Sequence, residues 1–226
     1  LEKYLSQLAK EYKKMGGRHC PIEIIIVGGA AIVLSYRFRL TTTDVDILPT
    51  YSVLFDAAKR IRDANHLSDD WINADFRFTK TFTLNLVKYS TFYKTYNQVL
   101  NVRVVKREYL IAMKLYSFRS YKYDISDISG ILYEHHIKRD DITYNQIDKA
   151  VKNLYGGWKD FKPEAIRFIK ELLDSKDYKK KYKDIREKEK SNRQIIETAI
   201  NNHPELPVGK LTAEEIIAKY KKKTKL

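Results

Sequence analysis

Two aspartates, Asp44 and Asp46, stand one residue apart in the stretch "TTTDVDILP". The apolar residues around and after them predict a strand from Asp44 to Leu48, which Pro49 ends. Residues two apart on a strand point to the same face, so the two carboxylates would lie side by side. Such a pair repels unless a cation lies between its members. The spacing therefore indicates a site for Mg²⁺ or Mn²⁺, although a merely polar strand end would give the same letters.

A pair of glycines, Gly28 and Gly29, follows the isoleucine-rich run Ile22–Val27. The run predicts a strand buried on both faces, and the residues from Ala30 to Tyr36 predict a helix. Glycines at such a junction let the backbone approach a ligand closely and direct the first N–H groups of the helix toward an anion. A tight turn with no ligand is the alternative. Together with the paired aspartates, the glycines favour a phosphate group next to a metal ion.

A lysine stands on the apolar stripe of a later helix. Leu110, Lys114 and Phe118 follow one another at intervals of four, beside Ile111 and Leu115. A buried ammonium group needs a partner, which a triphosphate or the carboxylates of the metal site would provide. The alternative is a lysine whose chain reaches the edge of the helix and solvent.

Two further aspartates, Asp124 and Asp127, are three residues apart and would share one helix face. One of them could orient Lys114 or accept a proton from an acceptor hydroxyl. Asp124 could instead cap the helix that follows it.

The elements divide the chain into two parts. Residues 1–105 predict a mixed α/β domain with strands at 22–27, 44–48 and 99–105, a strand or hairpin over 76–86, and helices over 1–15, 30–36 and 51–64. Residues 106–226 predict a helical domain, with helices over 107–119, 125–135, 144–155, 163–174 and 178–201. The fold class is therefore an α/β mixed-sheet domain followed by a C-terminal helical bundle that contributes lysine and aspartate to the cleft.

The composition sets broad limits. The chain has 226 residues, 43% of them hydrophobic, which excludes a disordered protein. A single cysteine, Cys20, excludes an internal disulfide, and no apolar run is long enough to span a membrane, so a cytoplasmic protein is expected. The net charge of +14 favours a polyanionic partner such as nucleic acid, although a lysine-rich surface with nothing bound would have the same charge. The charged stretch 176–190 is expected to be a solvated helix face, with contact to an RNA backbone as the alternative.

The order Gly28–Gly29, helix, then Asp44-Val45-Asp46 resembles the nucleotidyltransferase superfamily that includes DNA polymerase beta. The resemblance implies a nucleotidyltransferase-like mixed sheet in which the two aspartates hold Mg²⁺ and the glycines bind a nucleoside triphosphate. The chain departs from this pattern in two places. Gly29 stands where a serine is usual, and the predicted strand 99–105 has no third carboxylate.

The stretch "EYLIAMKLYSFRSYKYDISDI", from Glu108 to Ile128, is similar to a lysine helix and the acidic segment after it in the AbiEii-like nucleotidyltransferase toxins of type IV toxin–antitoxin systems. This similarity points to five residues: Lys114, Arg119, Lys122, Asp124 and Asp127. It implies that Lys114, Arg119 and Lys122 bind nucleotide, that Asp127 acts as base or orienting acid, and that Asp124 is a secondary candidate. It also implies RNA, above all tRNA, as acceptor and an antitoxin protein as partner.

The expected activity is transfer of a nucleotidyl group from a nucleoside triphosphate to an acceptor hydroxyl. Three alternatives remain: the same reaction on a small molecule such as an antibiotic, a catalytically inactive module that binds nucleotide or RNA, and a plain interaction protein such as an antitoxin partner.

Overall fold

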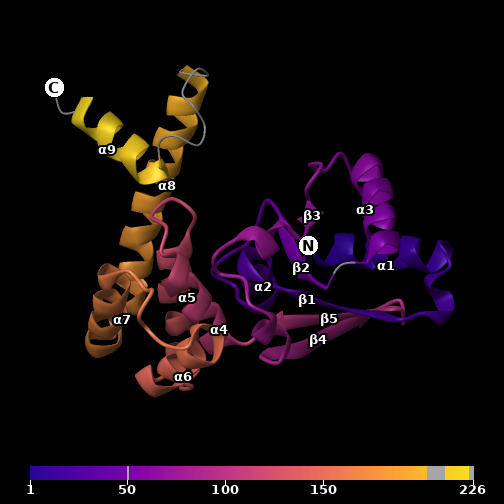
Figure 1. Cartoon of the computed structure of the whole chain (residues 1–226), viewed down its shortest axis with the longest axis horizontal. Coiled ribbons are helices and arrows are strands. Elements are labelled where there is room, and N and C mark those ends of the chain that lie inside the picture. Colours follow the sequence, from indigo (N-terminus) through magenta and orange to yellow (C-terminus); the bar gives the residue numbers. More distant parts are fainter. Residues whose placement is uncertain (50, 203–211, 224–226) are drawn as a thin grey trace.

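The computed structural model describes residues 1–49, 51–202 and 212–223. The fold has a sheet part and a helical part, which lie side by side in Figure 1. Within the described residues, no helix is long and apolar enough to cross a membrane.

A five-stranded mixed sheet forms the centre of the first part. Its strands are β1 (Ile22–Ile26), β2 (Val45–Leu48), β3 (Ile72–Asn73), β4 (Ser90–Tyr96) and β5 (Leu100–Val105), in the order β3-β2-β1-β5-β4. β1 is antiparallel to β2 and parallel to β5, and β3 runs parallel to β2. The side chains of Ile24, Ile25 and Ile26 are buried, as expected for a central strand covered on both faces.

Three helices accompany the sheet: α1 (Glu2–Lys14), α2 (Gly28–Ser35) and α3 (Ser52–Asn65). In Figure 1, α1 and α3 lie together over one face of the sheet, whereas α2 lies at the end that faces the helical part. The chain passes from β1 through α2 and a loop to β2. Because β1 and β2 are antiparallel, the end of β1 lies beside β2, and the first turn of α2 is therefore close to the start of β2.

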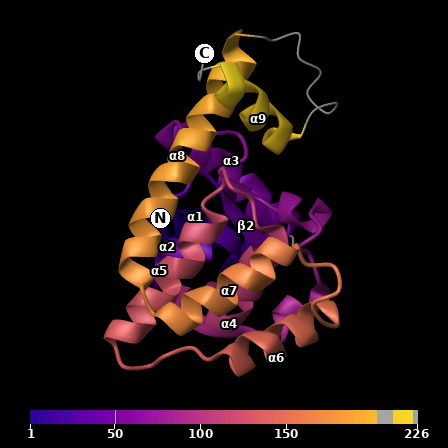
Figure 2. The same ribbon diagram turned by 90° about the vertical axis from the view of Figure 1, so that its left-hand side faces the viewer.

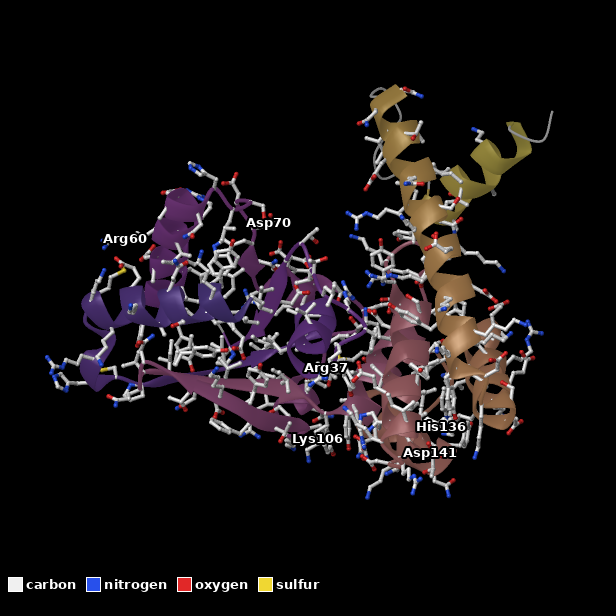
Figure 3. All side chains as sticks on the ribbon, turned by 180° about the vertical axis from the view of Figure 1, so that it is seen from behind. Arg37, Arg60, Asp70, Lys106, His136 and Asp141 are labelled. Atoms are coloured by element: carbon white, nitrogen blue, oxygen red, sulfur yellow. The ribbon has the colours of Figure 1, made fainter. Side chains whose placement is uncertain are left out.

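The helical part follows β5 after a single residue, Lys106, which Figure 3 shows at the junction of the two parts. Its helices are α4 (Arg107–Ser117), α5 (Asp124–Ile137), α6 (Tyr144–Tyr155), α7 (Pro163–Ser175), α8 (Tyr178–Asn202) and α9 (Ala213–Lys223). Figure 2 shows α8 running along this part with α9 near its far end. The expected boundary between residues 105 and 106 falls at this junction and stays a prediction, since one cluster of buried apolar side chains extends through both parts.

The fold class expected from the sequence is confirmed, but the strand or hairpin expected over 76–86 is wrong. This segment forms two short 3₁₀ helices, η2 (Asp75–Phe78) and η3 (Leu84–Val87). Its alternating apolar residues do not share one buried face, because Phe78 and Leu84 are 83% and 74% exposed. The hydroxyl of Thr79 donates to the carbonyl of Phe76, and Thr83 accepts from the amide of Asn85. Such local hydrogen bonds compete with sheet pairing.

Candidate functional site

A cavity of about 300 Å³ lies between the sheet part and the helical part. Its lining combines opposite charges. The carboxylates come from the sheet part and the α5 end: Asp44, Asp46, Asp70, Asp75 and Asp124. The cations come from the loop before β2 and from the helical part: Arg39, Lys114, Arg119, Lys122 and Arg193. Gly28 and Gly29 also line it, so of the nine residues expected to form the site, only Asp127 lies outside the lining.

Gly28 brings the start of α2 close to the second aspartate of the pair. Its φ of +61° lies in the left-handed region that glycine adopts without strain. A Cβ atom at this position would lie 3.4 Å from Oδ2 of Asp46. The first turn of α2, with its free N–H groups, therefore faces the same cavity as the carboxylates, as an anion-binding helix start would.

Gly29 has a different reason to be glycine. A Cβ atom here would lie 2.7 Å from Nη2 of Arg39 and 3.0 Å from Oγ1 of Thr42. The guanidinium group is held in place by Asp127, whose Oδ2 lies 2.5 Å from Nη1. Arg39 thus fills the space that a serine side chain would need, which gives a physical reason for the departure at Gly29.

Asp44 and Asp46 face the cavity without a cationic partner. Neither forms an ion pair within 4.0 Å among the described residues, and Asp44 lies only at the limit of hydrogen bonding from the hydroxyls of Thr42 and Thr43, at 3.4 and 3.5 Å. Burial, together with the charges of Asp44 and Asp75, raises the pKa of Asp46 to about 6, against the opposing effects of the Phe76 backbone and Lys114. A cation bound between Asp44 and Asp46 would therefore stabilise their charged forms.

The donor set fits a hard divalent cation that shares its ligands with a substrate. Among the described residues, no three carboxylate, histidine or cysteine side chains converge closely enough to hold a metal by themselves. Asp44 and Asp46 would supply two carboxylates, and phosphate oxygens and water would complete the octahedral shell that Mg²⁺ prefers.

Lys114 does not reach for solvent. It is 7% exposed, and its Nζ lies 2.9 Å from Oδ1 of Asp124 and 3.0 Å from Oδ2 of Asp127. Burial alone would lower the pKa of Lys114, but the two carboxylates raise it overall, so the ammonium group stays charged. The lysine on the apolar stripe is thus explained by two buried aspartates rather than by the metal-site pair.

Asp124 begins α5, but its carboxylate turns toward α4 instead of capping its own helix. It accepts hydrogen bonds from Lys114, from the hydroxyl of Ser117 at 2.7 Å, and from Nε of Arg119 at 2.8 Å. Burial alone would raise the pKa of Asp124, but Lys114 and Arg119 hold it far below its usual range. The capping alternative is therefore wrong for this residue.

Asp127 lies behind Arg39 and Lys114, which line the cavity, and does not line it itself. Its side chain is fully buried and contacts Arg39 and Lys114, while Nη1 of Arg186 lies 3.8 Å from its other oxygen. A carboxylate held by two cations and shielded from the cavity is suited to orienting Lys114 and Arg39. It is poorly placed to accept a proton from an acceptor hydroxyl.

Helix α8 contributes more than a solvated face. Glu189 is 1% exposed, and its Oε1 accepts the backbone N–H groups of Ile125 and Ser126 at 2.9 and 3.4 Å, which supplies a cap to α5. Arg186 lies over the ring of Tyr123 at 3.4 Å, and Arg193 lines the cavity. The expected solvated face is confirmed for the exposed lysines of the stretch, whereas Glu189 and Arg186 lie on the side of α8 that packs on α5.

The loop between α2 and β2 is fastened to the helical part. Glu134 accepts the backbone N–H groups of Arg37 and Phe38 at 2.6 and 3.0 Å, and the hydroxyl of Tyr182 donates to the carbonyl of Phe38 at 2.8 Å. Gly130 leaves room for the Phe38 ring, which would lie 2.6 Å from a Cβ there. These contacts fix the loop that leads to the paired aspartates.

The lining residues that the sequence did not single out include Arg39, Asp70, Asp75, Tyr123 and Arg193. Arg39 stands five residues before Asp44, but its partner Asp127 is 88 residues away in the chain, so no local pattern reveals the pair. Arg193 lies three residues beyond the charged stretch noted on α8.

One family of proteins matches most of this chain. The model of a family described as "nucleotidyltransferase of unknown function" (DUF6036) matches residues 3–183, a range that includes every expected site residue. No curated protein and no solved structure matches the chain.

Proposed function

The chain belongs to this family of nucleotidyltransferases of unknown function, and from this premise we propose that it transfers a nucleotidyl group from a nucleoside triphosphate to an acceptor hydroxyl with the help of Mg²⁺ or Mn²⁺. One observation carries the proposal. Two carboxylates without cationic partners, Asp44 and Asp46, face the start of α2 in a cavity whose opposite wall is cationic. This arrangement suits a metal-bound triphosphate.

The metal ion, held by Asp44 and Asp46, would neutralise phosphate charge and make the acceptor hydroxyl easier to deprotonate. The backbone N–H groups at Gly28 and Gly29 would bind phosphate oxygens. In the reaction, the acceptor oxygen forms a bond to the α-phosphorus, the bond to pyrophosphate breaks, and the hydroxyl proton passes to solvent. The protein's main contribution is to position the groups and stabilise charge.

The cations of the helical part would act on the phosphates from the other side. Arg119 and Lys122 line the cavity and are accessible, so we assign them direct phosphate contacts. Lys114 contributes positive potential from a fixed position, because Asp124 and Asp127 hold it. We assign Asp127 the role of a positioning residue.

We further propose RNA, above all tRNA, as acceptor, in a toxin of the AbiEii-like type with a cognate antitoxin. The net charge of +14 and the cationic wall support a polyanionic acceptor over a cationic antibiotic. An inactive module that binds nucleotide or RNA is the second candidate. The lack, within the described residues, of a third carboxylate that converges on the metal site favours it.

The test is incubation of the protein with Mg²⁺, total cellular RNA and each of the four α-³²P-labelled nucleoside triphosphates in turn. Label on RNA that disappears in the Asp44→Ala/Asp46→Ala variant, by a factor of ~10³ or more, would support the proposal and identify the nucleotide. Unchanged labelling in the folded double variant would overturn it. Metal-dependent nucleotide binding without label on RNA, small molecules or protein would support the inactive module.

A further inference from the structure

Lys80, Arg119 and Lys162 lie in one neighbourhood beyond the end of α4, close to Tyr116. Nζ of Lys80, in the segment between η2 and η3, lies 5.1 Å from the centroid of the Tyr116 ring. That ring lies 4.9 Å from the ring of Phe161, and Lys162 is the next residue. Arg119 follows Tyr116 by three residues. The charges of Lys162 and Arg119 both act on Lys80, so the three cations lie close to one another.

This place borders the cavity. Thr79 and Thr81, the two neighbours of Lys80, line it, as does Arg119. The hydroxyl of Tyr155 donates to the carbonyl of Thr81 at 3.0 Å and so fixes the segment that carries Lys80. A ligand that fills the cavity and extends past Arg119 would reach the two lysines.

The cluster has more positive charge than its carboxylates compensate. Within the part of the chain that the structure describes, Lys80 has no carboxylate within 4.0 Å, and Lys162 has only Glu214 of α9, at 3.7 Å. Arg119 is engaged by Asp124. Partial burial lowers the pKa of Lys80, and the charges of Lys162 and Arg119 lower it further against the smaller opposing effects of Asp124 and Glu214. Cations that repel one another beside a cavity indicate a place that an anion would stabilise.

We propose that Lys80 and Lys162, beside Arg119, form a phosphate-binding subsite that is separate from the metal-binding wall. The inference rests on the proposed nucleotidyl transfer, which offers two sources for the phosphate. It belongs either to the backbone of an RNA acceptor or to the phosphate tail of the nucleotide. Glu214 competes with that phosphate for Lys162.

The test compares the unaltered protein with three variants. Lys80→Gln/Lys162→Gln removes the subsite. Lys3→Gln/Lys10→Gln is the matched control, because it removes the same charge from two exposed lysines of α1, in the sheet part. Glu214→Gln removes the competing carboxylate. One arm measures binding of a short labelled single-stranded RNA by fluorescence anisotropy over a series of salt concentrations. The other measures binding of each Mg²⁺–nucleoside triphosphate by calorimetry.

If the phosphate belongs to RNA, the subsite variant weakens RNA binding about tenfold and lowers the magnitude of its salt slope by about 1.4, the value for two lost contacts to a single strand. Nucleotide binding then stays unchanged. If the phosphate belongs to the nucleotide, the subsite variant binds Mg²⁺–nucleoside triphosphate about tenfold more weakly, and its RNA binding stays unchanged. In either case Glu214→Gln strengthens the affected arm, and the control variant changes neither beyond the general effect of net charge.

A subsite variant that matches the control in both arms, while the unaltered protein binds Mg²⁺–nucleotide, overturns the subsite and leaves the proposed transfer intact. An unaltered protein that binds neither probe overturns both. A variant that has lost its native circular dichroism is replaced by the single Lys80→Gln, whose side chain is exposed, and the same two outcomes apply.

Discussion

Two pairs of aspartates serve the same cavity in opposite electrostatic states. Asp44 and Asp46 belong to the sheet part and have no ion-pair partner among the described residues, whereas Asp124 and Asp127 begin α5 and are surrounded by Lys114, Arg119 and Arg39. The pKa of Asp46 is raised to about 6, and that of Asp124 is held far below its usual range. Burial acts on both in the same direction, so the difference comes from the cations that each pair has.

The comparison assigns a structural role to one pair and a ligand-binding role to the other. The protein provides its own cations to the inner pair, Asp124 and Asp127, and thereby builds a fixed base for Lys114. It leaves the outer pair, Asp44 and Asp46, uncompensated at the cavity surface, where an external cation can bind. Carboxylates that repel each other at such a place destabilise the empty fold and are typical of a functional site.

The largest effect is expected from breaking the inner pair. Asp127→Asn removes the negative charge between Arg39 and Lys114, which leaves Lys114 with Asp124 alone and Arg39 without an ion-pair partner among the described residues. We expect the free energy of unfolding to fall by about 3–5 kcal/mol, as measured by urea denaturation at pH 7. Asp160→Asn, at an exposed aspartate, is the control and should change stability little.

A double variant sharpens this result. Lys114→Met combined with Asp127→Asn removes one cation together with the carboxylate, so the loss should be smaller than the sum of the two single losses. Equal stability of Asp127→Asn and the control would mean that the inner pair is not what holds the cations.

Much of the fold follows from local patterns in the sequence. The isoleucine run of β1, the short β2 and the amphipathic helices α4 to α8 have clear periodicity, and all are present close to their expected bounds. The segment 76–86 has a strand pattern as well, but its threonines bond to their own backbone and its apolar residues split between core and solvent. Periodicity cannot show which side of such a segment meets the core.

The electrostatic state of the site does not follow from local patterns. The spacing of Asp124 and Asp127 is visible in the sequence, but their state depends on Arg39, which comes from the loop before β2. The same arginine accounts for Gly29, because it fills the space beside that residue. The first fact depends on a contact between the two parts of the fold, and the second on the packing of a loop against α2 within the sheet part. Neither propensity nor spacing encodes such contacts.

A smaller effect is expected at Gly29, which lies beside Arg39, the partner of Asp127. Gly29→Ala places a methyl group 2.7 Å from Nη2 of Arg39, which Asp127 prevents from moving freely. We expect a loss of about 1–3 kcal/mol in the free energy of unfolding, together with weaker binding of Mg²⁺–nucleotide in calorimetry. In an Arg39→Ala background the same methyl group should cost much less. An equal cost in both backgrounds would show that Arg39 is not the obstacle.

The smallest effect concerns the outer pair. Here a substitution is expected to raise the free energy of unfolding, whereas the loss of ordinary contacts would lower it. Because the pKa of Asp46 is raised from 3.8 to about 6 in the folded protein, the fold binds a proton more tightly than the unfolded chain does. Ionisation of Asp46 therefore does not reduce the free energy of unfolding below pH 4. It reduces this free energy progressively as the pH rises from 4 to 6, and the reduction remains at higher pH. Asp46→Asn should remove this reduction, so the metal-free variant should be more stable than the unaltered protein by about 1–2 kcal/mol at pH 7.5, a value reduced for the partial exposure of the group.

Thermal unfolding with and without Mg²⁺, at pH 4 and at pH 7.5, would measure this difference. The two proteins should have similar stability at pH 4. At pH 7.5, Mg²⁺ should stabilise the unaltered protein and have little effect on Asp46→Asn, because a bound cation relieves the same repulsion that the substitution removes. A variant that is less stable at pH 7.5 would mean that Asp46 already has a partner in the fold. A variant that gains as much from Mg²⁺ as the unaltered protein does would mean that the ion does not bind at Asp46. Either result would remove the contrast between the two aspartate pairs. If removing the charge of Asp46 does not stabilise the fold, this carboxylate is not an unpaired charge that a bound cation would neutralise.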